Sequence, residues 1–154
     1  MNVAVMQPYL FPYLGYFNLI HACDAFIFLD NVQHIPRGFV NRNRILMTGS
    51  AHMFTVPLAA APRDKWINER HVGGNFHQFY NKFIATLEHA YSKAPHKHEI
   101  LELVSQVLGC GEENLARLCD KSIRAVCRYL GLERTMLVAS DMMTTDQARQ
   151  LRGQ

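Results

Sequence analysis

The chain has 154 residues, 49% of them hydrophobic and 19% charged, which suffices for one domain spanning residues 1–154 with its own core but not for two. No apolar run of about 18 residues is free of charges, and the first residues lack a basic segment followed by an apolar one, so we expect a cytoplasmic protein without a membrane span. The net charge of +3 slightly favours anionic ligands, but the dense basic stripe typical of nucleic-acid binders is missing, so we do not expect that function.

Two apolar runs with a helical pattern between them predict an N-terminal β-α-β unit. Residues 2–7 have the character of a buried strand that stops at Pro8, and residues 25–29 have that of a second strand. Apolar residues at helical spacing predict a helix over 13–22. This connection is long enough for the right-handed crossover that parallel strands require, so we predict that the two strands are parallel.

The parallel arrangement has a consequence for function. Gln7 and Asp30 would both lie at the carboxyl ends of their strands, on one edge of the sheet. Open α/β sheets place their ligands at this edge. The sequence therefore predicts a polar site there.

A hairpin is expected after a long polar connection over residues 30–43. Residues 44–47 and 52–57 flank Thr48-Gly49-Ser50, a predicted glycine-containing turn, which makes the predicted sheet mixed but largely parallel. Residues 59–74 have no clear period, and we interpret them as a loop, with a short strand near Ile67 as the alternative.

Three helical patterns predict a cluster of helices in the C-terminal half of this α/β chain. The first begins at Asn75 and is interrupted by Pro95, the second covers 100–108, and the third covers 115–130, with Gly131 suited to the position after its end. Residues 135–139 then resemble another buried strand. Residues 144–151 have the composition of a helix start that Thr145 could cap.

The turn after the first predicted strand is unusually aromatic. Residues 6–17 contain three tyrosines, two phenylalanines and two prolines. Tyr9 and its neighbours could give a ligand both a flat apolar face and a hydroxyl group. The alternative, equally open at this stage, is a hydrophobic staple that docks the first helix.

The connection over residues 30–44 carries most of the candidate polar groups. They are Asp30, Gln33, His34, Arg37, Asn41, Arg42 and Asn43. Arginine suits bidentate capture of carboxylate or phosphate, and asparagine and glutamine can read hydroxyls or an amide. His34, near Asp30, is a candidate for acid/base chemistry. A solvated basic connector, with an exposed loop histidine, is the alternative.

Metal and cofactor chemistry find little support in the residue spacing. The closest histidine pairs are His71 with His77 and His96 with His98, and neither has a recognised ligand spacing. No dinucleotide, phosphate-loop or nucleophile-elbow motif is present, so we expect no metal and no cofactor. Cys119 and Cys127 fall on the apolar stripe of the third helix, where small buried thiols are usual. Cys23 could lie near the pocket, but it has no assigned histidine partner.

Three segments taken together resemble the WbqC-like protein family of bacteria. They are the opening Q-P-Y-L-F-P-Y-L-G-Y-F at 7–17, residues 24–33 with D-N-V-Q, and N-R-N-R-I at 41–45. The signature positions are Gln7, Tyr9, Pro12, Gly15, Asp30, Gln33, Asn41, Arg42 and Asn43. The resemblance extends over essentially the whole chain, although members usually continue well beyond its last residue, so this chain could be a truncated or inactive form.

The resemblance implies a role in the synthesis of O-antigen and other surface polysaccharides, with transfer of glycine to a sugar amine. The expected partner is then a small molecule, anionic or a sugar nucleotide. The resemblance assigns no catalytic roles, but the chemistry of the residues suggests them: Asp30 as base or amine anchor, Arg42 or Arg37 as anion clamp, and Gln7 and Asn41 as orienting groups. The alternative is a non-catalytic module that binds a sugar nucleotide or a partner subunit.

Overall fold

A computed structural model describes residues 1–143 and 147, and its first feature is a parallel three-stranded sheet. The strands are β1 (Val3–Met6), β2 (Ala25–Phe28) and β5 (Thr135–Val138), in the order β1-β2-β5. Helix α1 (Leu14–Ala22) connects the first two strands. The predicted β-α-β unit and its parallel direction are therefore confirmed. The register pairs Met6 with Phe28 and Phe28 with Val138, so all three strands end at one edge.

The hairpin forms a two-stranded sheet of its own. Its strands are β3 (Arg42–Met47) and β4 (Ser50–Thr55), which pair antiparallel. Strand β3 begins two residues before the predicted start and ends at Met47 as predicted, whereas β4 begins two residues early because the turn has only two residues, Thr48 and Gly49. Their φ angles are +46° and +79°. Two left-handed central residues match the twist of antiparallel strands, so pairing continues up to the turn and includes Ser50.

The three predicted helices are present in the C-terminal half. They are α2 (Phe76–Ala90), α3 (Lys97–Leu108) and α4 (Leu115–Tyr129). The Asn114 side chain caps α4 by accepting a hydrogen bond from the Arg117 amide, and Gly131, with φ at +67°, follows its end as expected.

The alternative of a short strand near Ile67 is wrong. Residues Ile67–Glu69 form a single-turn 3-10 helix, η1. The Glu69 carboxylate accepts a hydrogen bond from the Trp66 amide at 2.8 Å, and this closes the chain into a turn. The last predicted strand ends at Val138, and Ala139 begins a short helix, α5 (Ala139–Met142). The helix start predicted over 144–151 lies outside the described residues, 147 aside.

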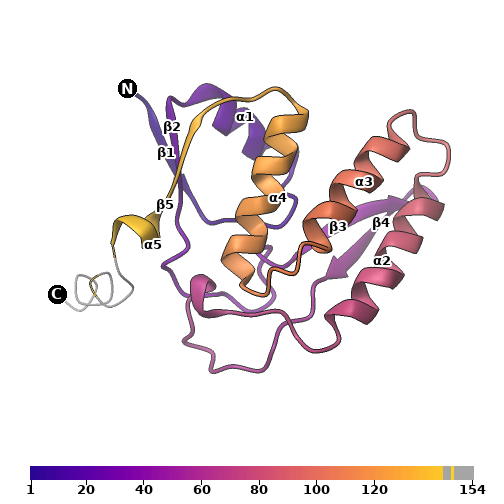
Figure 1. The fold of residues 1–154 in the computed structure, drawn as a ribbon, viewed down its shortest axis with the longest axis horizontal. Helices are drawn as coiled ribbons and strands as arrows, with labels where there is room; N and C mark the ends of the chain where they lie inside the picture. The colour runs from indigo at the N-terminus through magenta and orange to yellow at the C-terminus, as the bar shows by residue number, and fades with distance from the viewer. Residues whose placement is uncertain (144–146, 148–154) are drawn as a thin grey trace.

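Helix α4 joins two hydrophobic clusters. In Figure 1 it lies between the parallel sheet and the pair α2 and α3. Its first half contributes Leu115, Leu118 and Cys119 to a cluster with α2, α3 and the loop residues Leu10 and Val40. Its second half contributes Ile123 and Cys127 to a cluster with α1 and the sheet. The predicted burial of Cys119 and Cys127 on this stripe is confirmed. Among the described residues, no helix is long and apolar enough to cross a bilayer.

Candidate functional site

A polar cleft of about 520 Å³ lies at the carboxyl edge of the parallel sheet. The ends of β1, β2 and β5 each contribute to it, and the first half of α4 and a residue of η1 complete it. Its lining comprises Pro8, Phe28, Asp30, Asn68, Glu112, Asn114, Ala116, Arg117, Asp120, Lys121, Val138, Ser140 and Asp141. This is the position where open α/β sheets place their ligands. We call it the carboxyl-edge cleft.

Asp30 is the acid that connects two sides of this cleft. The residue is only 3% exposed. Its Oδ1 accepts a hydrogen bond from the Ser140 amide at 2.9 Å, and its Oδ2 accepts one from the Ser140 hydroxyl at 2.5 Å. These two bonds join the end of β2 to the start of α5. They also fix the orientation of the Asp30 carboxylate.

Asp120, on α4, is the second acid of the cleft. Burial raises the pKa of its carboxyl group, Arg124 opposes this with an ion pair at 2.7 Å, and the charges of Asp141 and Asp30 raise the pKa further. A carboxyl group with a raised pKa is better suited to proton transfer near neutral pH than an ordinary aspartate. Asp120 therefore has the electrostatic setting of a proton-transfer group.

Positive charge is present on the same side of α4. The Lys121 ammonium lies 3.1 Å from the Glu112 carboxylate, and the hydrogen bond to Glu112 raises the pKa of Lys121. Arg117 is exposed. The cleft thus has acids near the sheet and cations toward solvent. Among the described residues, no cluster of three His, Cys, Asp or Glu side chains could hold a metal ion.

A second cleft, of about 290 Å³, lies beside the start of β3. Of the predicted site residues it brings together His34, Arg37, Asn41 and Arg42, and it adds Arg70 from the end of η1. His34 is 6% exposed, so the alternative of an exposed loop histidine is wrong. Its backbone amide bonds to Lys65, and this draws the loop inward. We call this the arginine cleft.

The remaining predicted residues make contacts within the fold. The Gln7 carbonyl accepts a hydrogen bond from the Tyr16 hydroxyl at 3.0 Å, and the ring of Tyr9 lies 6.0 Å from that of Tyr16. The exposed Gln33 side chain donates to the Arg63 carbonyl. Asn43 donates to the Phe11 carbonyl. None of these contacts assigns a ligand.

The aromatic segment over residues 6–17 is anchored to the core. The Leu10 amide donates to the Val40 carbonyl at 2.9 Å, and the Phe11 amide donates to the Ser122 hydroxyl of α4 at 3.2 Å. Leu10 itself is completely buried. These bonds give the segment a docking role, and its candidate Tyr9 lines neither polar cleft.

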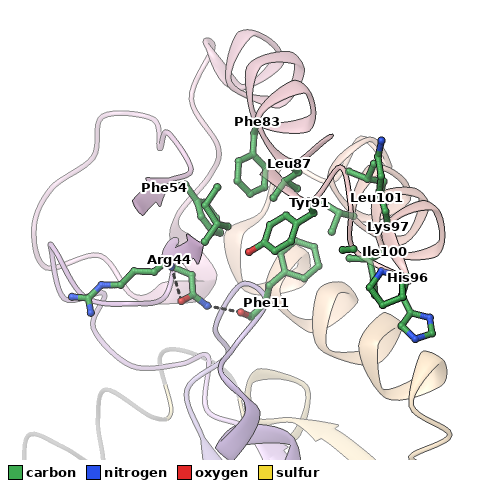
Figure 2. A pocket seen from close by; sticks show the side chains of 15 residues that line it. Phe11, Arg44, Phe54, Phe83, Leu87, Tyr91, His96, Lys97, Ile100 and Leu101 are labelled. Atoms are coloured by element: carbon green, nitrogen blue, oxygen red, sulfur yellow. Dashed lines mark hydrogen bonds between the residues drawn. The ribbon is translucent and has the colours of Figure 1, made fainter. Parts of the chain in front are cut away.

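An apolar pocket of about 390 Å³ lies between the hairpin and the helices α2 and α3. Figure 2 shows the rings of Phe54 from β4, Phe83 from α2 and Tyr91 from the end of α2 around it, with Phe11 beside them. The Arg44 side chain extends away from these rings (Figure 2). Asn43 fixes this wall through its bonds to Phe11 and Arg44. Its lining is mostly apolar, and the polar side chains of His96 and Lys97 border it on the α3 side.

Three important residues were not predicted from the sequence. Ser140 and Asp120 belong to the carboxyl-edge cleft, and Arg70 belongs to the arginine cleft. Asp120 directly follows Cys119, which belongs to the apolar stripe of α4. From the sequence alone, an acid at this position is interpreted as part of the solvent-exposed face of the helix. Only the docking of α4 beside β2 and β5 makes it part of a cleft. Ser140 and Arg70 had no local signal.

A family model described as the WbqC-like protein family matches residues 7–152. The chain is also 32% identical over 147 residues to Rv1507c of Mycobacterium tuberculosis, a protein described as uncharacterized. That match covers 94% of this chain and 63% of the relative, so the chain spans less than two thirds of the relative's length. No solved structure matches the chain significantly.

Proposed function

The chain belongs to the WbqC-like protein family, and from that premise we propose that it is a transferase of surface-polysaccharide synthesis. The proposed reaction moves an amino-acyl group, such as glycyl, to the amine of a nucleotide-linked amino sugar. The carboxyl-edge cleft is the observation that carries the proposal, because it holds a buried acid, Asp30, and a half-buried one, Asp120, at the expected sheet edge.

The chemistry asks for a group that accepts a proton. The lone pair of the sugar amine forms a bond to the acyl carbon, the bond from that carbon to the leaving group breaks, and the leaving group takes the electron pair. The attacking nitrogen loses a proton. Asp120 suits this step because burial and the nearby charges of Asp141 and Asp30 raise the pKa of its carboxyl group.

Asp30 has a different part in the proposal. Its carboxylate is held by the two hydrogen bonds from Ser140, so its position is fixed before a substrate enters. A fixed anion can orient an ammonium or hydroxyl group of a sugar. In this proposal Asp30 anchors the amine, and Ser140 is a positioning residue.

The test is turnover by the purified chain. Incubation with nucleotide-linked amino sugars and activated glycyl donors should produce a sugar heavier by one glycyl group, which mass spectrometry detects. Asp120→Asn should lower the rate by about 100-fold or more, since general base catalysis contributes at least that much. Asp64→Asn, which removes a charge from an exposed loop, is the matched control and should leave the rate unchanged.

Asp120→Asn also alters the ion pair with Arg124, so its fold must be checked. We expect its circular dichroism spectrum to match that of the unaltered chain. If no donor and acceptor pair gives product with the unaltered chain, the proposed transfer is wrong.

The second candidate, a non-catalytic binding module, is favoured by one observation: both oxygens of Asp30 already have partners within the fold. Saturable binding of an amino sugar without turnover would support that candidate.

A further inference from the structure

The titratable side chains that line the arginine cleft are all basic. They are His34, Arg37, Arg42 and Arg70, and no Asp or Glu occurs among the described residues that line it. Three guanidinium groups therefore face a small cleft that has no acidic partner in its own wall. Guanidinium groups bind phosphate and carboxylate oxygens through paired N–H donors.

Two buried nitrogen atoms of this cleft have no hydrogen-bond partner among the described residues. They are Nε2 of His34 and Nε of Arg70. His34 is more than nine-tenths buried, so bulk water does not compensate its ring nitrogen. Buried polar atoms in folded proteins nearly always have a partner, either from the chain or from a bound molecule. A bound ligand could therefore supply the missing hydrogen-bond partners of these two nitrogen atoms.

Arg70 and Asn41 both influence the His34 ring. Burial and the Arg70 guanidinium lower the pKa of His34, whereas a hydrogen bond to the Asn41 side chain raises it. The Asn41 amide nitrogen donates to the Val56 carbonyl at 2.8 Å, which leaves the amide oxygen for the ring. Nε2 of His34 is therefore a buried ring nitrogen that has no partner among the described residues.

The arginines are held as well. Arg42 donates from Nε to the Gly38 carbonyl at 2.8 Å, and its guanidinium lies 5.7 Å from the centre of the Phe39 ring. Arg70 donates to the carbonyls of Ala59 and Ala61 at 3.4 and 3.5 Å. Arg37 is exposed. A charge held by its own chain loses less conformational freedom when it binds a ligand.

We propose that the arginine cleft is an oxyanion site that binds a phosphoryl group, with His34 and Arg70 at its base and Arg37 and Arg42 at its mouth. Its volume of about 290 Å³ is sufficient for a phosphoryl group. The phosphoryl group could belong to free phosphate or to the diphosphate of a sugar nucleotide. This inference does not depend on the proposed transfer, because binding is measured without any reaction.

Isothermal titration calorimetry of the full chain with inorganic phosphate, sulfate and a nucleotide diphosphate sugar tests the proposal. Each probe should bind saturably, and Arg37→Gln should weaken binding about tenfold through loss of a charge-assisted contact. Arg63→Gln is the matched control, because it removes the same charge from an exposed neighbouring loop. Its effect should stay below about twofold, as expected for screened charge alone.

The probes also distinguish the two sources of the phosphoryl group. Much tighter binding of the nucleotide sugar than of phosphate, with the same loss in Arg37→Gln, would identify the nucleotide. Equal affinity would identify a free anion. The proposal is overturned if none of the probes binds saturably, or if Arg63→Gln weakens binding as much as Arg37→Gln.

A pH series with sulfate tests the part assigned to His34, because sulfate keeps its charge while histidine titrates. Affinity should rise as the pH falls from about 7.5 to about 5.5, since the protonated ring gains a donor at Nε2. The charged groups around the ring in this cleft are Arg37, Arg42 and Arg70, which keep their charge over this range. His34→Gln should remove the pH dependence. A flat profile in the unaltered chain would exclude His34 from the site, and Arg37→Gln still decides the proposal if His34→Gln does not fold.

Discussion

Ser140→Ala tests the contact on which the carboxyl-edge cleft depends. The substitution removes the hydroxyl that donates to Asp30 Oδ2 at 2.5 Å and leaves the amide bond to Oδ1 at 2.9 Å. Hydrogen bonds to charged groups contribute about 1.5–3 kcal/mol to the free energy of unfolding. Because Asp30 lines a cleft that water can enter, a water molecule can replace part of the lost hydrogen bond. We therefore expect the free energy of unfolding to fall by about 1.5 kcal/mol.

Urea denaturation followed by circular dichroism measures this loss, and the midpoint of thermal unfolding should fall by about 3–6 °C. Ser140→Thr keeps the hydroxyl and should recover most of the stability. Ser92→Ala, at an exposed serine, is the control and should change the free energy of unfolding by less than about 0.5 kcal/mol. If Ser140→Ala is as stable as the control, the reasoning that Ser140 holds the Asp30 carboxylate fails.

Three further outcomes are expected. Phe83→Ala should lower the free energy of unfolding in urea by about 3 kcal/mol, the lower end for a buried ring, because the Phe83 ring packs with its centre 4.4 Å from that of Phe54 but already borders the apolar pocket. A loss under about 1 kcal/mol would contradict its place in the core. Iodoacetamide should label the exposed Cys110 in the native chain, whereas Cys119, whose thiol pKa is raised by burial, should react only after unfolding. Mass spectrometry locates the label, and labelled Cys119 in the native chain would contradict this prediction. Burial and Arg70 lower the folded-state pKa of His34 below its usual 6.5, so the unfolded chain binds more protons below that pH and the stability of the fold decreases as the pH falls. The urea midpoints at about pH 7.5 and about pH 5.5 should therefore differ less in His34→Gln than in the unaltered chain. Equal differences in the two proteins would contradict the lowered pKa of His34.

Elements whose signal is local were predictable from the sequence. The apolar stripe of α4 repeats with the helical period, and the segment that forms β2 is a short, continuously apolar run rich in β-forming residues, so local pattern was sufficient. The bounds of the hairpin were not, because a two-residue turn with Thr48 in the left-handed region has no distinctive signature. The turn at η1 was missed because its closing bond uses a side chain, Glu69.

The candidate site was only partly accessible from the sequence. Parallel strands predicted that Asp30 would lie at the carboxyl edge, and it does. The predicted polar residues nevertheless separate into two clefts, with Asp30 in one and His34, Arg37 and Arg42 in the other. Neighbours in sequence are turned to different sides when the loop between them folds back over the core.

The sequence by itself determined the α/β class, the parallel β-α-β unit and the helices of the C-terminal half, because each depends on residues a few positions apart. Tertiary structure alone decided which groups share a cleft. Ser140 reaches Asp30 across 110 residues, and it does so only because β5 pairs with β2. Arg70 likewise enters the arginine cleft through a contact between segments that are distant in sequence. Such contacts depend on how the whole chain packs, and no local sequence pattern predicts them.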